Sequence, residues 1–80
     1  MNSTRPRALS GSDSPEDRQL TKRENEVMRC LAKGRYDKEI AEELGISVWT
    51  VHFHLRSIYQ KLLADNRIEA VNKWSERNYA

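Results

Sequence analysis

Apolar side chains recur at helical spacing in four stretches of this chain, separated by short polar segments. The first stretch predicts a helix over residues 22–33, because its apolar positions fall three and four residues apart. Thr21 followed by Glu24 has the spacing of a capping box, in which each side chain bonds the backbone N–H of the other residue. Gly34 marks the end of this helix. Its apolar positions are Val27, Met28 and Leu31.

Two further helices are predicted on either side of a very short turn. The segment 37–44 has an apolar face, Asp37 as a plausible N-terminal cap and Gly45 as its stop. Ser47 is a good cap for the next helix, residues 47–62, so that only two residues separate the segments. A short helix, a tight turn containing glycine and a longer helix form the outline of a helix-turn-helix.

The helix predicted over residues 47–62 divides its side chains between a core face and an outer face. An apolar stripe at helical spacing should pack on the core: Val51, Leu55, Ile58 and Leu62. At about 100° per residue, the outer side carries Trp49, Thr50, Phe53, Arg56, Ser57 and Gln60. His52 and His54 fall on opposite flanks, because two steps turn a helix by about 200°.

A fourth helix, predicted over residues 66–78, has one face for the core and an opposite face of mixed character. The core side chains are Ala70, Val71 and Trp74. The opposite face repeats with helical spacing through Ile68, Asn72, Ser75 and Tyr79. Two interpretations stay open for this half-apolar face, a solvated surface and a helix-to-helix dimer contact.

Together the four stretches predict an all-α fold, a four-helix bundle that contains a helix-turn-helix and occupies residues 20–80. Residues 1–19 are rich in Ser and Pro and have almost no apolar side chains, so they cannot bury enough surface to offset the entropy of ordering. We interpret them as a flexible tail or linker. They are either the start of a small stand-alone protein or a linker to a further domain.

Charge and cysteine content narrow the class of protein. The net charge of the 80 residues is only +2, but the segment 47–62 holds Arg56, Lys61 and two His and no acid. One cysteine cannot form an intramolecular disulfide. No apolar run reaches membrane-spanning length and no secretory signal is recognisable, so we expect no membrane partner and a cytoplasmic location.

Metal binding and catalysis find little support in the residues. His52 and His54 do not share a helix face, as zinc ligands at i and i+4 do, and no Cys, Asp or Glu in residues 47–62 completes a site. The chain has no glycine-rich phosphate loop, no nucleophile with a plausible base and no pair of convergent acids. We therefore expect no metal site, no cofactor and no enzymatic activity.

Four short motifs in residues 20–74 resemble the LuxR/FixJ/GerE-type DNA-binding domain, the output module of many bacterial transcription factors including NarL-type response regulators. The motifs are "LT-x-RE-x-EV", "KEIA-x-x-L-x-IS", "TV-x-x-HL" and "KL…NR-x-EAV". Each is weak alone, but all four occur in order and at family spacing. The resemblance implies that the helix over residues 47–62 lies in the major groove of DNA, and that the fourth helix mediates dimerisation.

The resemblance also implies which side chains contact DNA. Family contacts to bases and phosphates match His52, Phe53 and Arg56, and a basic residue near the end of the same helix matches Lys61. Four positions depart from the family pattern, and at one of them Asp65 stands where some members have a basic residue near the start of the fourth helix. His52 replaces the usual Lys or Arg, Tyr36 replaces a Ser or Thr cap, and Leu63 replaces a Gly.

Trp49 and Phe53 are neighbours on the outer face of the helix over residues 47–62. Burying them would expose the apolar stripe on the other side of the helix. That would lose more hydrophobic free energy than it gains, at about 25 cal/mol per Å2 of apolar surface. We therefore expect both to be exposed, and exposed apolar clusters call for a function. Phe53 could contact thymine methyl groups while Trp49 packs on the sugar-phosphate backbone. Alternatively, the pair could anchor a protein partner.

The expected function is sequence-specific binding of duplex DNA by a homodimer that regulates transcription. The expected DNA-binding residues are Lys38, Ser47, Trp49, Thr50, His52, Phe53, Arg56 and Lys61, and the expected dimer residues are Ile68, Asn72, Ser75 and Tyr79. The alternative is a protein-interaction module on the same fold, in which Trp49 and Phe53 dock another regulator or the transcription machinery.

Overall fold

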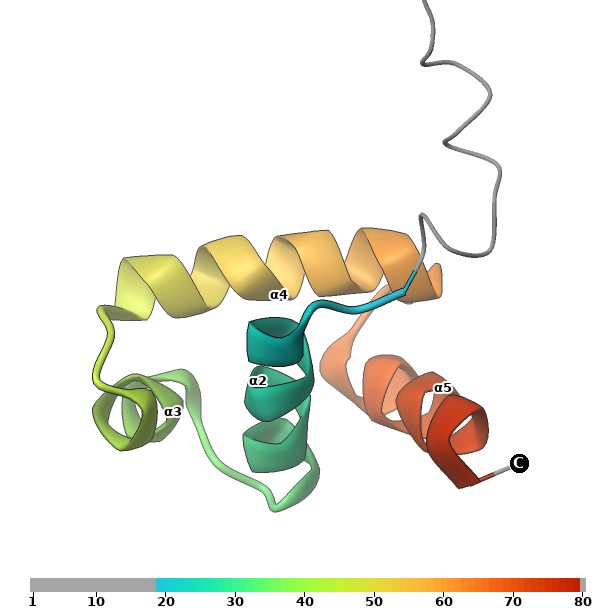
Figure 1. The fold of residues 1–80 in the computed structure, drawn as a ribbon, viewed down its shortest axis with the longest axis horizontal. Coiled ribbons are helices and arrows are strands. Elements are labelled where there is room, and N and C mark those ends of the chain that lie inside the picture. The colour runs from blue at the N-terminus through green and yellow to red at the C-terminus, as the bar shows by residue number, and fades with distance from the viewer. Residues whose placement is uncertain (1–18, 80) are drawn as a thin grey trace, which may run out of the picture.

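The computed structural model describes residues 19–79 and forms four helices in that range (Figure 1). They are α2 (Lys22–Ala32), α3 (Asp37–Leu44), α4 (Val48–Leu62) and α5 (Arg67–Tyr79). The all-α prediction is confirmed, and every predicted helix boundary lies within one residue of the observed one. The prediction of a tail over residues 1–19 falls almost wholly outside the described residues.

The core lies between α4, which runs along one edge of the domain, and the other three helices (Figure 1). All four residues of the predicted α4 stripe are buried, and α2 contributes the predicted Val27, Met28 and Leu31. Ile40 of α3 and Trp74 of α5 close the core from either side. A chain of this size must place most of its large apolar residues in one cluster, and this domain does so.

Helix caps predicted from the sequence are present at the start of α2 and of α4. The Glu24 N–H donates to Thr21 Oγ1 at 3.1 Å, and the Thr21 N–H donates to Glu24 Oε1 at 2.8 Å, which completes the capping box. Ser47 Oγ accepts the N–H of Thr50 at 3.0 Å. These bonds satisfy backbone donors that have no partner within the helix.

The prediction that Asp37 caps α3 is wrong. Tyr36 occupies the cap position with extended backbone, and its N–H donates to Glu39 Oε1 at 2.7 Å. Asp37 is the first residue of the helix itself. Glu39 thus forms the half of a capping box that accepts the backbone N–H of the cap residue, and no side chain at Tyr36 caps the first N–H groups of α3. The Asp37 carboxylate is available to other helices.

A buried carboxylate ties α2 to α4. The side chain of Glu24, which is 4% exposed as a residue, accepts hydrogen bonds from Ser57 Oγ and from Lys61 Nζ, each at 2.8 Å. Burial raises the pKa of Glu24, but the hydrogen bonds from Lys61, Thr21 and Ser57 outweigh burial, so the net pKa lies below its ordinary value. Glu24 is thus an ionised group whose partners come from both helices.

Candidate nucleic-acid interface

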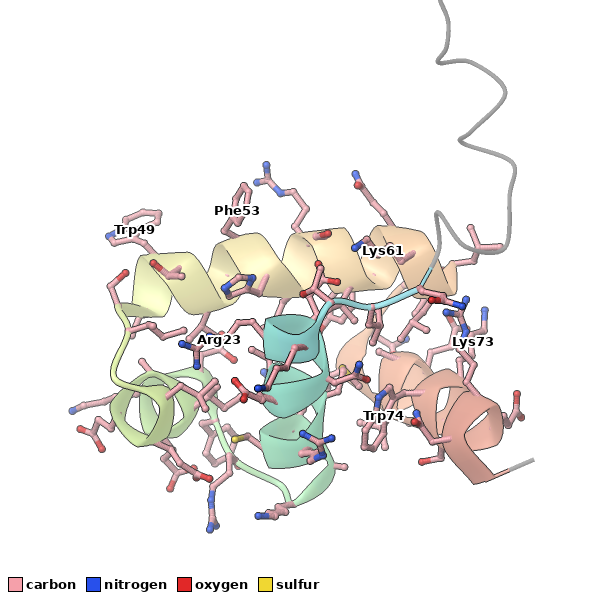
Figure 2. The ribbon with its side chains drawn as sticks, viewed as in Figure 1. Arg23, Trp49, Phe53, Lys61, Lys73 and Trp74 are labelled. Atoms are coloured by element: carbon pink, nitrogen blue, oxygen red, sulfur yellow. The ribbon has the colours of Figure 1, made fainter. Side chains whose placement is uncertain are left out.

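The outer face of α4 carries two large exposed aromatic side chains. Trp49 is 83% exposed and Phe53 is 70% exposed, as the helical pattern predicted. Both point away from α2, α3 and α5 (Figure 2). Because the apolar stripe on the other side of α4 packs into the core, this face is free to meet a partner.

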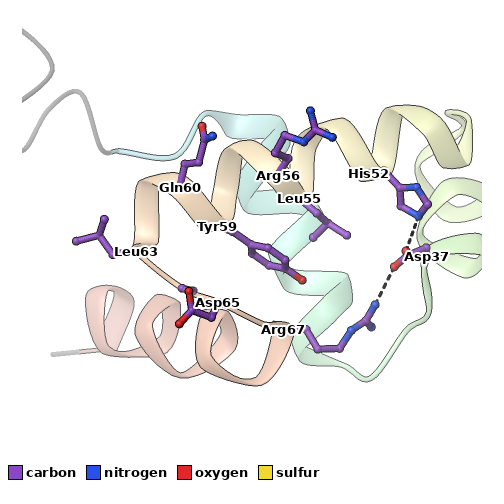
Figure 3. Close-up of a pocket in the computed structure, with 10 residues that line it drawn as sticks. Asp37, His52, Leu55, Arg56, Tyr59, Gln60, Leu63, Asp65 and Arg67 are labelled. Atoms are coloured by element: carbon purple, nitrogen blue, oxygen red, sulfur yellow. Dashed lines mark hydrogen bonds and ion pairs between the residues drawn. The ribbon is translucent and has the colours of Figure 1, made fainter.

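Arg56 and Gln60 extend this exposed face along α4 (Figure 3). The guanidinium of Arg56 forms no ion pair with any other residue in the range 19–79, so its five donors are available to a ligand. Lys38, at the start of α3, is likewise exposed and has no ion-pair partner within that range. These two residues are cations that an anionic partner can approach directly.

The N-terminus of α4 adds polar groups to the same surface. Ser47 and Thr50 lie next to each other, with 2.9 Å between the two hydroxyl oxygens, and either hydroxyl can be the donor. Trp49 lies between them in sequence and is the most exposed side chain of the group. Unpaired N–H groups and the positive end of the helix dipole make such a terminus favourable for a phosphate.

Lys61 is held differently from the other predicted cations. Its ammonium lies 2.8 Å from the buried Glu24 carboxylate, and its side chain is only 24% exposed. Releasing it to a phosphate would leave a buried carboxylate without its cation, which is costly. The sequence did not reveal this competition, because Glu24 precedes Lys61 by 37 residues.

His52 is also engaged inside the domain. Its Nε2 lies 2.7 Å from Oδ2 of Asp37, and Oδ1 of the same carboxylate accepts a hydrogen bond from Nη2 of Arg67 at 2.9 Å (Figure 3). Helical periodicity predicts that His52 lies on a flank of α4, but it does not identify Asp37 or Arg67 as neighbours of this residue. They come from α3 and α5, at separations for which helical periodicity carries no signal.

An open groove of about 800 Å3 runs beside the exposed face, between the C-terminal half of α4 and the starts of α3 and α5. Leu55 and Tyr59 form part of its wall, and charged side chains stand along it (Figure 3). The charged and titratable residues that line it are Asp37, His52, Arg56, Tyr59, Asp65 and Arg67. Burial raises the pKa of the Tyr59 phenol above its ordinary value.

The second predicted contact surface lies on α5. Ile68 is 72% exposed, Asn72 is exposed and Ser75 is half-buried. The side chain of Tyr79, the fourth predicted member, lies outside the described part of the structure. On the opposite side of α5, the indole N–H of Trp74 donates to Asn25 Oδ1 at 2.9 Å and fixes the helix against α2 (Figure 2).

The described residues contain neither a metal-binding cluster nor a membrane-spanning helix. No group of three or more His, Cys, Asp or Glu in that range is placed to hold a metal ion. None of the four helices is long and apolar enough to cross a bilayer.

Comparison with known proteins places this geometry in a family. The family model for bacterial regulatory proteins of the luxR family, GerE, matches residues 18–74. The transcriptional regulatory protein DesR of Bacillus subtilis is 43% identical over 60 residues, which are 75% of this chain and 30% of DesR. LiaR of the same organism is 39% identical over 70 residues, 88% of this chain and 33% of LiaR. UhpA of Escherichia coli is 44% identical over 64 residues, 80% of this chain and 31% of UhpA.

The matched region is the part of the chain that builds the fold, and it spans about a third of the length of these relatives. It contains the helix-turn-helix formed by α3 and α4 and the start of α5. The chain therefore belongs to the luxR family of bacterial regulatory proteins, a family of DNA-binding transcription regulators and not of enzymes.

Proposed function

We propose that this chain binds duplex DNA sequence-specifically as a homodimer, with α4 in the major groove. The observation that carries the proposal is the outer face of α4, where Trp49, Phe53 and Arg56 are exposed while the reverse side is packed. A helix held at the edge of a domain with one face free has the shape that the major groove admits.

The side chains that contact bases lie in the middle of α4. Arg56 can donate two parallel hydrogen bonds to O6 and N7 of guanine, because its guanidinium is a planar fork with no partner among the described residues. Phe53, one turn earlier, can contact the methyl group of thymine. Thr50 and His52 flank these two on the same helix and complete the set of base-contacting candidates.

The side chains that contact phosphates lie at the periphery of the same surface. Lys38 supplies a cation from α3, Ser47 supplies a hydroxyl at the start of α4, and Trp49 can pack on the sugar-phosphate backbone. Lys61 takes part only by sharing its ammonium with Glu24. With few free cations, electrostatic affinity should be modest, because each neutralised phosphate contributes through counterion release.

Dimerisation is proposed to use the outer face of α5. Ile68 is a large apolar side chain that the domain leaves 72% exposed, and Asn72 follows it on the same face. A twofold contact between two such helices would bury Ile68 against its copy and place two α4 helices in successive turns of the groove.

The names of the relatives describe regulators of transcription, and we propose the same role for this protein in the cytoplasm.

A second function is favoured by one observation, the pair of exposed aromatics beside a single unpaired cation on α4. Such a pair can anchor a protein partner, for example another regulator or the transcription machinery. In that case the domain would use the same face without entering a groove.

Selection of bound sequences from a random pool of duplex DNA tests both functions. We expect one enriched motif, in two half-sites about one helical turn apart, and an affinity that falls steeply with salt. Absence of enrichment at low salt would exclude specific DNA binding and favour protein docking. Enrichment of single half-sites would support DNA binding but argue against the dimer.

A further inference from the structure

The imidazole of His52 is fixed at one of its two nitrogens. Nε2 lies 2.7 Å from Asp37 Oδ2, while Asp37 Oδ1 accepts from Arg67 at 2.9 Å (Figure 3). The guanidinium of Arg67 also donates to the carbonyl oxygen of Arg35 at 3.4 Å. Arg67 of α5 therefore holds the carboxylate of Asp37 in place. The carboxylate in turn fixes the orientation of the His52 ring on α4.

This arrangement determines where the imidazole carries its hydrogen. A carboxylate is an acceptor only, so the hydrogen in the contact between Asp37 and His52 belongs to Nε2. In the neutral ring Nδ1 then has a free lone pair and accepts hydrogen bonds. Nδ1 has no hydrogen-bond partner in the described range of residues, and the side chain of His52 is 51% exposed.

The free acceptor lies on the flank of the helix that we propose to enter the groove. The ring of His52 stands edge-on to Trp49, with 6.4 Å between ring centroids, and Phe53 is the next residue in sequence. In the major groove, the hydrogen-bond donors of the bases are the amino groups of adenine N6 and cytosine N4. An acceptor at Nδ1 complements these groups and is repelled by the acceptors of guanine and thymine.

We propose that Asp37 is a positioning residue for base recognition, which presents Nδ1 of His52 as an acceptor for the amino group of adenine or cytosine. This inference rests on the proposed function, because it requires α4 to enter the groove. A Lys or Arg side chain at this position could only donate, so an acceptor at His52 should select a different base.

The charged and titratable groups near the ring of His52 come from α3, α4 and α5 and from the turn before α5. Asp37 from α3 is the one that bonds His52, and Arg67 from α5 reaches the ring only through that carboxylate. Arg56, Tyr59 and Asp65 line the same groove. Both experiments address the neutral ring, in which Nδ1 is an acceptor, and are run at one alkaline pH.

The first test measures the tautomer of His52 in the free protein, so its result does not depend on DNA binding. Imidazole 15N chemical shifts should show hydrogen on Nε2 in the wild type and a mixture of tautomers in Asp37→Ala. Glu43→Ala is the matched control, because it removes one negative charge from the same helix and breaks an exposed ion pair with Arg35. Hydrogen on Nδ1 in the wild type, or an unchanged ring in Asp37→Ala, would overturn the proposal.

The second test is sequence selection with the wild type, His52→Ala, Asp37→Ala and Glu43→Ala. At one base pair the wild type should prefer adenine or cytosine by about tenfold over the other bases, the discrimination typical of one good base contact. His52→Ala and Asp37→Ala should both lose that preference while preferences at other positions persist, and Glu43→Ala should retain all of them.

Each other outcome of the selection also has a defined meaning. A preference that survives in Asp37→Ala excludes its positioning role, and a uniform loss of affinity with a smaller salt slope in His52→Ala makes that residue a phosphate ligand instead. Absence of any enriched sequence for the wild type rejects the proposed function, whatever the variants do. Asp37→Asn keeps the shape should Ala unfold the domain, and it replaces one of the two carboxylate oxygens that face His52 and Arg67 with an NH2 donor.

Discussion

Leu63 ends α4 in a backbone conformation that suits glycine. It has φ 57° and ψ 44°, and among the described residues it is the only non-glycine with positive φ. A side chain costs about 1–2 kcal/mol in this left-handed region. The resemblance in sequence implied a glycine at this position, so the departure at Leu63 has a direct structural consequence.

Leu63→Gly should stabilise the domain by about 0.5–1 kcal/mol, since relief of strain exceeds the entropic cost of glycine. The side chain is 63% exposed, so little apolar burial is lost. Urea denaturation measures the change. Gly45→Ala is the mirror control, because Gly45 has φ 69° and open space around it, and it should lose about the same amount. A less stable Leu63→Gly would mean that the groove contacts of Leu63 outweigh its strain.

Arg56→Ala should weaken binding to the selected DNA site by about 1–3 kcal/mol and relax the base preference at one position, because it removes a two-pronged contact. Fluorescence anisotropy on the selected site and on single-base variants measures both effects. Lys38→Ala is the contrasting variant, which should weaken all sequences alike and reduce the salt slope by about one. Unchanged affinity in Arg56→Ala would remove this residue from the interface.

At the scale of helices, the buried Glu24 joins the start of α2 to the middle and end of α4. The capping box was predicted from the spacing of Thr21 and Glu24, and it is confirmed. The bonds to Ser57 and Lys61 were not predicted, because they depend on how the two helices cross. One carboxylate therefore serves both local helix capping and long-range packing.

Glu24→Gln should cost about 1–3 kcal/mol at neutral pH, because charge-assisted hydrogen bonds in a buried site are lost. The pKa of Glu24 is lower in the folded chain than its ordinary value of 4.5, so its stabilisation is present above that pH and is lost as pH falls through the folded pKa. The gap between wild type and variant should thus close in acid.

Chemical denaturation at neutral pH and at about pH 3 measures this gap. Glu26→Gln is the control on the same helix, since its ion pair with Arg23 is exposed and should contribute less than about 1 kcal/mol. A gap that stays constant with pH would show that the charge of Glu24 does not contribute to stability.

At the scale of the whole molecule, we propose that the exposed face of α4 contacts DNA and that the exposed face of α5 forms the dimer contact. Ile68→Asp should keep the fold, because the residue is 72% exposed, and should shift the protein towards monomer in sedimentation equilibrium. Half-site binding should persist while binding to the paired site loses its cooperativity. Tyr36→Asp, at the same exposure before α3, should leave the oligomeric state unchanged. An unaltered monomer–dimer equilibrium in Ile68→Asp would place the dimer contact elsewhere.

Local physics explains what could be predicted from the sequence alone. Helical periodicity and the rules of capping and left-handed stops are properties of residues three or four apart, so the four helices, the α4 core stripe and the exposure of Trp49 and Phe53 followed from the chain itself. The predicted cap at Asp37 was wrong because α3 begins at Asp37 itself, with Tyr36 at the cap position.

The ion pairs between side chains of different helices depend on how the helices pack against each other. Lys61 meets Glu24, and His52 meets Asp37, across 37 and 15 residues, and each pair joins two helices whose crossing brings the side chains within reach. No spacing rule relates residues on different helices, because their separation depends on packing angles set by the whole core. The sequence alone thus determined which face of α4 is exposed, and the tertiary structure decided which of its polar groups are free to bind.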